Sequence, residues 1–596
     1  MVDAVVIPPS RTSSMKRKQR LMNETRTQKR KKCTKWLMLN AVCLTLNMGL
    51  LCGMFIFHAH WMPTPDTNLV LKAHLQNRRE FWALLRGGNQ NQNGRNSEQE
   101  DEKANTGNHN TSDQETDKNK DATAAEKDAS KNSNNNQNQN QNNRQQNDAS
   151  EKEKRALKID YTLPTSPHNS PNDPDYDLSQ QQYHIIFSTG CSDKQHWQSY
   201  ILFHSILTSG QQGHVTRIAS GCTEEEEEAL KHIHNTQMEP MGNGKFHLHL
   251  TPEFGEGFHY NNKPYGVHHW MEAVLGYSKD KTSTDHDNTI LFLLDPDQVI
   301  MRPFVNEFPS DKEIWAPRTT YPLQTRIMHG YPMAAEYGYK DQWHQKIDVT
   351  QIIQDSPVTN QLSAKDIREN YHAGPPYAAT AKDFYHIVTQ WRAFAQPVHD
   401  QYPYLLSEMF AYSLAAAHLK LPHQLARTFM VSDWKEPGMD LVTKQSGVES
   451  SQMCRHVPIE HKPHILHYCQ RLALGKYMMT KHRLPDHFVG NQESCKMPLL
   501  MEPPDDVAVQ LDYFVDVNEQ KRYDIRDNVN HAYTKQEKIN QVAFLLCEEL
   551  KAFNLAATYY KEHHCPAEQR NLDKTLIFFD QLELTEEEKN QKGEVV

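Results

Sequence analysis

Two aspartates, Asp295 and Asp297, are the residues whose spacing points most directly to chemistry. They follow an apolar run that ends at Leu294, and such a run is typical of a buried strand. Pro296 disfavours a helical conformation at Asp295, so the chain should stay extended there. Because side chains alternate along an extended chain, the two carboxylates are predicted to point the same way.

Two converging carboxylates repel each other unless a cation lies between them. The pair therefore predicts a site for a hard divalent ion, Mn²⁺ or Mg²⁺, which takes oxygen ligands and leaves positions free for phosphates. The alternative is an ordinary polar turn after a strand, which places acids at this spacing without any metal.

His467, in the sequence Ile-Leu-His-Tyr-Cys, is a second candidate ligand. If residues 465–468 are extended, Ile465 and His467 share one face, which then ends in an imidazole that Mn²⁺ accepts. His464 is expected to face away from it. The alternative for His467 is a hydrogen-bonded core histidine, since the chain has 33 histidines.

The elements that must position these residues alternate between strands and helices. Continuous apolar strands that alternate with helices are typical of a mostly parallel sheet covered on both faces. The fold class predicted is therefore α/β, and ligands are expected at the carboxyl ends of the strands. The predicted strands are residues 183–190, 214–221, 245–252 and 288–297, and the predicted helices are residues 193–207, 223–233 and 263–277.

The N-terminal part of the chain predicts a membrane anchor. Residues 1–35 carry 11 Lys and Arg against two acids, and residues 36–57 then contain no formal charge. Such a stretch is about 33 Å long as a helix, enough to cross a bilayer core. The positive-inside rule makes residues 1–35 a cytosolic arm and residues 36–58 a transmembrane signal anchor. The alternative, a cleaved signal peptide, would have a shorter apolar core and end in small residues.

Composition divides the rest of the chain. Residues 59–180 are expected to be a largely disordered, Asn- and Gln-rich stem, because they lack the apolar surface that offsets ordering entropy. Residues 181–496 then form the catalytic domain, and residues 497–596 a helical extension. A helix over 535–563 in this extension is expected to pack on the catalytic domain, with a partner surface as the alternative.

Charge and cysteines limit the classes of function. The net charge is −10 and the basic residues cluster in the N-terminal arm, which argues against nucleic-acid binding. Seven of the ten cysteines follow the predicted anchor and would face an oxidising lumen. Seven is odd, so at least one is free or pairs between chains, and no two of them have the close spacing of a zinc site.

Four stretches together resemble the hydroxyproline O-arabinosyltransferase and peptidyl serine α-galactosyltransferase families, over about residues 183–476. The arm, single anchor and stem likewise resemble a Golgi glycosyltransferase of the GT-A type. The resemblance implies a GT-A-like Rossmann-type sheet, a UDP-sugar donor, a divalent metal and retention at the anomeric carbon. It also implies a lumenal enzyme that modifies hydroxyproline or serine of secreted or cell-wall glycoproteins. The four stretches are residues 187–206, 291–304, 374–391 and 404–423.

The same resemblance assigns roles to individual residues. Asp295 and Asp297 match its metal and diphosphate motif, His467 completes the metal site, and Lys476, nine residues on, binds the diphosphate. Glu408, in Ser-Glu-Met-Phe-Ala-Tyr, matches a catalytic acid near the acceptor or the reacting sugar. Its alternative is an ordinary acid in the first turn of a helix. The stem and the tail from about residue 497 have no counterpart in these families.

Three functions remain open from the sequence. The first is transfer of arabinose or galactose to hydroxyproline or serine. The second is a transferase of the same fold with a glycan acceptor. The third is a non-catalytic lumenal protein that tethers or binds a partner, which the intact Asp-Pro-Asp motif and His467 disfavour.

Overall fold

The structure is a computed structural model that describes residues 161–166, 169–254, 258–511, 513–516, 521–524 and 532–577. All of them belong to the second of the two units into which the chain divides, Ser97–Val596. The basic arm, the predicted anchor and most of the predicted stem lie outside the described residues. Within the described part of the chain, no helix combines the length and apolar character needed to span a bilayer.

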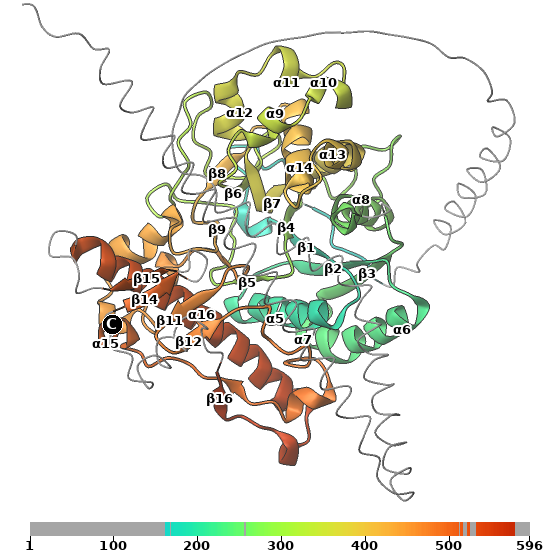
Figure 1. The fold of residues 1–596 in the computed structure, drawn as a ribbon. Coiled ribbons are helices and arrows are strands. Elements are labelled where there is room, and N and C mark those ends of the chain that lie inside the picture. The colour runs from blue at the N-terminus through green and yellow to red at the C-terminus, as the bar shows by residue number, and fades with distance from the viewer. Residues whose placement is uncertain are drawn as a thin grey trace, which may run out of the picture. The chain divides into compact units, whose positions relative to one another are not determined.

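A seven-stranded sheet with the strand order β3-β2-β1-β4-β7-β6-β8 lies at the centre of this unit (Figure 1). The first four strands in sequence pair in parallel, as their continuous apolar runs predict. β7 is antiparallel to both of its neighbours, while β6 and β8 pair in parallel. The prediction of a mixed α/β fold with a mostly parallel sheet is confirmed. The strands are β1 Tyr183–Thr189, β2 His214–Ser220, β3 Phe246–Thr251, β4 Ile290–Leu294, β6 Met333–Glu336, β7 Ala373–Thr380 and β8 Gln424–Ala426.

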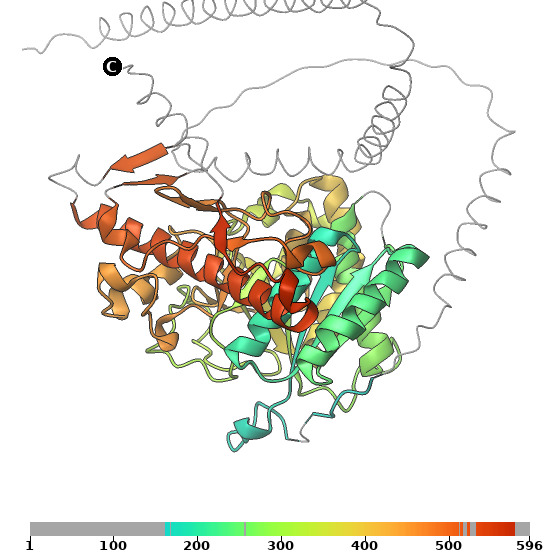
Figure 2. The ribbon, with the colours of Figure 1, turned by 90° about the horizontal axis from the view of Figure 1, so that it is seen from below.

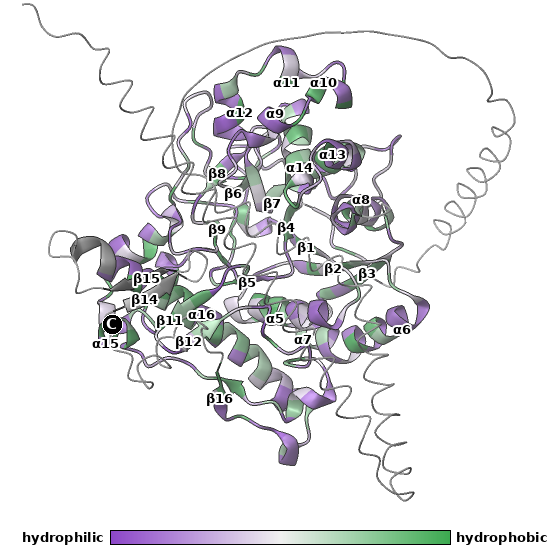
Figure 3. Cartoon of the chain, in the orientation of Figure 1, coloured by the Kyte–Doolittle hydropathy of each residue, from purple (hydrophilic) through white to green (hydrophobic). Residues whose placement is uncertain are grey.

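Helices cover both faces of the sheet. In β1, Phe187 joins the apolar cluster that contains α5, whereas Ile186 joins the cluster that contains α8, α13 and α14. Alternate side chains of one strand thus enter two different cores, which explains why the strand is apolar throughout. In contrast to these apolar strands, helix α6 is largely hydrophilic (Figure 3). The helices are α5 Asp193–Ser209, α6 Glu224–Ile233, α8 Asn262–Leu275, α13 Ala381–Gln401 and α14 Ser407–His418.

A small three-stranded sheet, with the order β5-β10-β9, extends from the end of β4. β5 (Gln298–Ile300) begins immediately after the Asp-Pro-Asp sequence, and β10 (Ile465–His467) runs antiparallel to it. β9 (Met430–Val431) pairs with the other edge of β10. The register places His467 opposite Gln298, so a residue from far along the chain lies beside Asp297.

The long C-terminal helix α16 (Ala532–His564) packs on the rest of the unit, as predicted for residues 535–563. Figure 2 shows α16 lying across the unit, and its apolar side chains join the same cluster as α5. Phe553 contacts the ring of Trp197. Disulfide Cys454–Cys547 anchors the middle of α16, and Cys495–Cys565 anchors the residue directly after its C-terminal end.

The other disulfide joins Cys191 to Cys222, and Cys469 is the free cysteine among the described residues.

The shorter elements are α7 Glu239–Gly242, α9 Gln342–Lys346, α10 Val349–Ile352, α11 Pro357–Asn360, α12 Ala364–Asn370, α15 Val507–Gln510, β11 Leu472–Leu474, β12 Tyr477–Met479, β13 Leu499–Leu500, β14 Tyr513–Asp516, β15 Lys521–Asp524 and β16 Lys574–Leu576.

Candidate active site

Asp295, Asp297 and His467 converge at the carboxyl end of β4. Each offers one ligand atom, and these atoms all lie within 4.8 Å of one another. Nε2 of His467 is 3.2 Å from Oδ1 of Asp297. Two carboxylates and an imidazole form a donor set that suits Mn²⁺, so the residues present fit the metal that the sequence predicts.

Backbone contacts hold the aspartates in this position. The amide oxygen of the buried Gln298 accepts a hydrogen bond of 3.1 Å from the backbone N–H of Asp295. The backbone N–H of Tyr468 donates to the carbonyl oxygen of Asp297 at 3.2 Å. The turn after β4 is therefore held both by Gln298, in the strand that follows it, and by Tyr468, directly after β10.

Asp297 lies between two basic groups. Nζ of Lys481 is 2.8 Å from its Oδ2, on the side opposite His467. Burial alone would raise the pKa of Asp297, but Lys481 and His467 outweigh it and hold that pKa well below the usual range. Burial would likewise lower the pKa of His467, yet Cys469 and Asp297 raise it well above its usual value. Without metal, Lys481 and His467 thus supply the positive charge that stabilises the buried Asp297 carboxylate.

A second pair of charges adjoins the first. Nζ of Lys263, in the first turn of α8, is 2.8 Å from Oδ1 of Asp295 and 3.4 Å from Oε2 of Glu408. Glu408 lies in the first turn of α14, which begins at Ser407, and is only 4% exposed. Its other oxygen, Oε1, is buried without a hydrogen-bond partner among the described residues.

The state of Glu408 follows from these neighbours. Burial raises its pKa to about 7, with Asp295 adding to the rise and Lys263 opposing it. A buried polar atom without a partner is rare in a folded protein and marks a place where a ligand or water can bind. The alternative prediction of an ordinary first-turn helix acid does not account for this burial.

Lys476 lies apart from these charges. It is exposed in the turn between β11 and β12, with Nζ 5.4 Å from the ring centre of Tyr477. Because Leu474 pairs with Tyr477 across that hairpin, residues 475 and 476 must form the turn. Lys481, just beyond β12, makes the contact with Asp297 instead.

Lys263 and Lys481 are therefore the site residues that sequence reasoning missed. Lys263 and Asp295 are 32 positions apart in the sequence, so no local spacing could reveal the pair. For Lys481, a basic residue was expected in this region, but the register of the β11–β12 hairpin decides which one reaches the site.

Tyr337 packs closely beside these residues. A Cβ added to Gly374 of β7 would lie 1.9 Å from the Tyr337 ring, so only glycine permits this approach. Burial, with Asp295 next, raises the pKa of Tyr337 well above its usual value. The phenol beside the aspartates is therefore neutral.

Comparison with known proteins gives a sequence relative. No protein-family model matches the chain. The chain is 24% identical over 331 residues to peptidyl serine α-galactosyltransferase of Arabidopsis thaliana. The match covers 55% of this chain and 34% of the relative, so the chain spans about a third of that protein's length. The resemblance to a glycosyltransferase family that the motifs indicate is thereby confirmed.

Solved structures of glycosyltransferases give only remote likenesses. The bifunctional glycosyltransferase WbbM has a TM-score of 0.27 at 10% identity, covering 50% of this chain and 46% of its own. The galactosyltransferase LgtC has a TM-score of 0.26 at 11% identity, covering 48% and 87%. GlyE of Streptococcus pneumoniae TIGR4 has 0.25 at 11% identity, covering 48% and 54%. At such TM-scores these likenesses carry no argument.

Proposed function

We propose that the chain is a metal-dependent glycosyltransferase that moves a sugar from a UDP-sugar to a serine or hydroxyproline hydroxyl of a secreted glycoprotein. The observation that best supports this is the convergence of Asp295, Asp297 and His467 beside the buried, unpartnered oxygen of Glu408. The sequence match to a peptidyl serine α-galactosyltransferase supports the choice of reaction and acceptor.

The roles of the residues follow from their positions. Asp295, Asp297 and His467 would hold Mn²⁺ or Mg²⁺, which when bound neutralises charge on the diphosphate leaving group. Lys263 and Lys481 already touch the two aspartates and add positive charge at the same place. Positive groups fixed where negative charge develops stabilise the transition state without reorganising during the reaction.

Glu408 would act on the acceptor. Its pKa of about 7 suits a group that exchanges a proton near neutral pH, and its free oxygen can accept a hydrogen bond from the incoming hydroxyl. In the transfer, the acceptor oxygen bonds to the anomeric carbon as the bond from that carbon to the diphosphate breaks. The hydroxyl proton passes to Glu408 or to the departing phosphate oxygen.

The proposed location is the Golgi lumen, with residues 36–58 as a type II anchor. Three disulfides among the described cysteines support an oxidising compartment, because such bonds persist there and are rare in the cytosol. The basic arm before the apolar segment supports the orientation.

The test is a donor panel with the full chain and Mn²⁺. UDP-arabinose and UDP-galactose are each offered with serine-rich and hydroxyproline-rich peptides, and transfer is measured as a peptide mass shift. A pentose or hexose shift with one acceptor supports the proposal and names the sugar. A shift only on a glycan acceptor would move the enzyme to the second function. Absence of transfer, of UDP-sugar hydrolysis and of a thermal shift with UDP would favour the tethering protein.

A further inference from the structure

Arg217, in the middle of β2, is a fully buried cation with neutral partners. It is 0% exposed and donates from Nε to the hydroxyl of Thr189 at 2.9 Å and from Nη2 to the carbonyl oxygen of Gly190 at 3.2 Å. Nη1 lies 3.2 Å from Nδ1 of His196. Burial, and then Arg217, lower the pKa of His196 to about 4, so this ring is neutral and accepts the hydrogen bond. No carboxylate among the described residues pairs with Arg217.

This isolation is unusual because a buried charge is strongly disfavoured without a counter-charge. Burial lowers the pKa of Arg217 only to about 9, so the guanidinium stays charged at neutral pH. The nearby acids at the sheet edge cannot be its partners. Asp295 and Glu408 contact Lys263, and Asp297 contacts Lys481 and His467.

The strand register places Arg217 close to the candidate site. Arg217 pairs with Phe187 of β1, and Phe187 pairs with Leu294, the residue before Asp295. Two strand spacings separate Arg217 from β4, about 10 Å between backbones. Its partners Thr189 and Gly190 end β1, so the guanidinium points toward the same edge of the sheet as the two aspartates.

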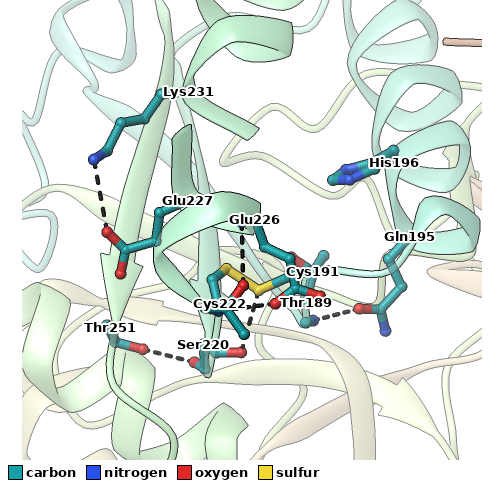
Figure 4. Close-up of a disulfide and its surroundings, with 12 residues drawn as sticks. Thr189, Cys191, Gln195, His196, Ser220, Cys222, Glu226, Glu227, Lys231 and Thr251 are labelled. Carbon is teal, nitrogen blue, oxygen red and sulfur yellow. Dashed lines mark hydrogen bonds and ion pairs between the residues drawn. A yellow bond between two sulfur atoms is a disulfide. The ribbon is translucent and has the colours of Figure 1, made fainter. Parts of the chain in front are cut away.

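The turn that Arg217 contacts is firmly held. Cys191, next to Gly190, forms the disulfide with Cys222 in the turn after β2 (Figure 4). The backbone N–H of Gly190 donates to the side-chain oxygen of Gln195, the bond drawn in the same view. A charge fixed behind a rigid turn can act on a ligand in front of it without moving.

We infer that Arg217 is a positioning residue for the donor, and that it supplies uncompensated positive charge against which the diphosphate of a UDP-sugar binds. Arg217 acts through the Thr189–Gly190 turn and does not touch the reacting atoms. The inference rests on the proposed donor. For a charge separation on the order of 10 Å and an effective dielectric constant of about 20, one such charge is worth about tenfold in affinity for a Mn²⁺-bound diphosphate with a net charge of about −1.

The test compares ligands that differ in charge. Binding of UDP and of uncharged uridine is measured by calorimetry with Mn²⁺ for the wild type and for Arg217→Met, Arg217→Gln and Arg217→Lys. The two neutral variants should weaken UDP binding about tenfold and leave uridine binding unchanged. Arg217→Lys should stay within about twofold of the wild type. With the donor sugar, KM should rise in the neutral variants while kcat stays within about twofold.

Arg302→Met is the matched control. Arg302 is a largely buried arginine with a counter-charge, since Nη2 lies 2.6 Å from Oε1 of Glu313. Its loss should lower the melting temperature and leave UDP affinity unchanged. Arg217→Gln keeps a side-chain N–H for Gly190, so it covers the case in which Arg217→Met does not fold.

Three results would overturn the inference. They are wild-type UDP affinity in both neutral variants, an equal loss of uridine binding, or an Arg217→Lys variant as weak as Arg217→Met. An equal loss for uridine would mean that Arg217 only shapes the turn. A wild-type protein that binds no UDP with Mn²⁺ would instead contradict the proposed function, a result distinct from any difference among the variants.

Discussion

Titratable residues gather both at the carboxyl edge of the main sheet, where its parallel strands end, and at its amino edge, where they begin. The pKa values of the histidines shift in opposite directions at the two edges. At the carboxyl edge, His467 lies against Asp297 and its pKa rises. At the amino edge, the rings of His184 of β1, His214 of β2 and His247 of β3 lie close together, and none of the described acids forms an ion pair with them. Burial, reinforced by the neighbouring histidines, lowers the pKa of His247 to about 3.

The contacts at the amino edge explain its neutrality. Nδ1 of His214 is 2.8 Å from Nε2 of His247, and the ring of Tyr161 stacks on His247 at 4.0 Å. These are the contacts of packed, uncharged rings. A cluster of histidines thus becomes a candidate site only where opposite charges are buried with it.

Loss of a carboxylate ligand should have the largest effect. Asp295→Asn and Asp297→Asn should each reduce transfer by about 10²–10³-fold, because each removes charge that holds the metal against the diphosphate. Asp383→Asn is the control at the amino edge, where the carboxylate accepts a 2.7 Å hydrogen bond from Gly330. Initial rates with Mn²⁺ should be unchanged in this control. Equal loss at both edges would remove the functional distinction between them.

Glu408→Gln should separate activity from stability. Transfer should fall by about 10²-fold or more, because the amide cannot take a proton. The pKa of Glu408 is raised to about 7, so the folded state binds more protons than the unfolded state between about pH 4.5 and 7. Its contribution to stability is therefore lost as pH rises through this window. The variant should melt a few degrees above the wild type at pH 8, and a lower melting temperature there would contradict the burial argument.

His467→Ala and His464→Ala form a matched pair. His467→Ala should raise the Mn²⁺ concentration for half-maximal activity about tenfold or more, because it removes one of the three ligand atoms. His464 instead packs on Phe304 and lies 3.3 Å from Glu313. Its loss should cost about 1–3 kcal/mol of stability with the Mn²⁺ requirement unchanged. A Mn²⁺ effect of the same size in both variants would contradict the prediction that His464 and His467 face in different directions.

Lys481→Met and Lys476→Met compare the lysine found at the site with the one that sequence predicts. Lys481→Met should raise the KM for the UDP-sugar about tenfold, because it removes a cation 2.8 Å from Asp297. Lys476→Met should change KM by less than about twofold, since its exposed turn makes no contact with either aspartate. Steady-state kinetics decide between them, and the reverse order would restore the sequence-based assignment.

His247→Phe should have the smallest effect, on stability alone. The depressed pKa of His247 means that the folded state binds fewer protons than the unfolded state between about pH 3 and 6.5. Its contribution is complete above pH 6.5 and is lost as pH falls, by about 2 kcal/mol at pH 5. Phenylalanine keeps the stack on Tyr161 and removes this titration, so melting temperatures should fall less steeply with acid. Transfer at neutral pH should be unchanged.

Much of the fold follows from local sequence. The four parallel strands appear where short apolar runs predict them, because strands buried on both faces need continuous apolar residues. Asp295 and Asp297 converge as predicted, but β4 ends at Leu294 and a turn at Pro296 and Asp297 brings the carboxylates together, not the alternation of an extended chain. The odd cysteine count left at least one cysteine either free or paired between chains, and Cys469 is free among the described cysteines.

Other features needed the tertiary structure. The sequence allowed His467 to be a ligand or a core residue, and the antiparallel pairing of β10 with β5 brings it to Asp297. A different pairing, the β11–β12 hairpin, leaves Lys476 in the turn and brings Lys481 to Asp297. The local sequence around Lys263, Glu408 and Arg217 does not indicate which residues lie beside them in the folded protein. Local propensity and periodicity act over a few residues, whereas the charge and burial of these groups depend on residues up to 184 positions apart.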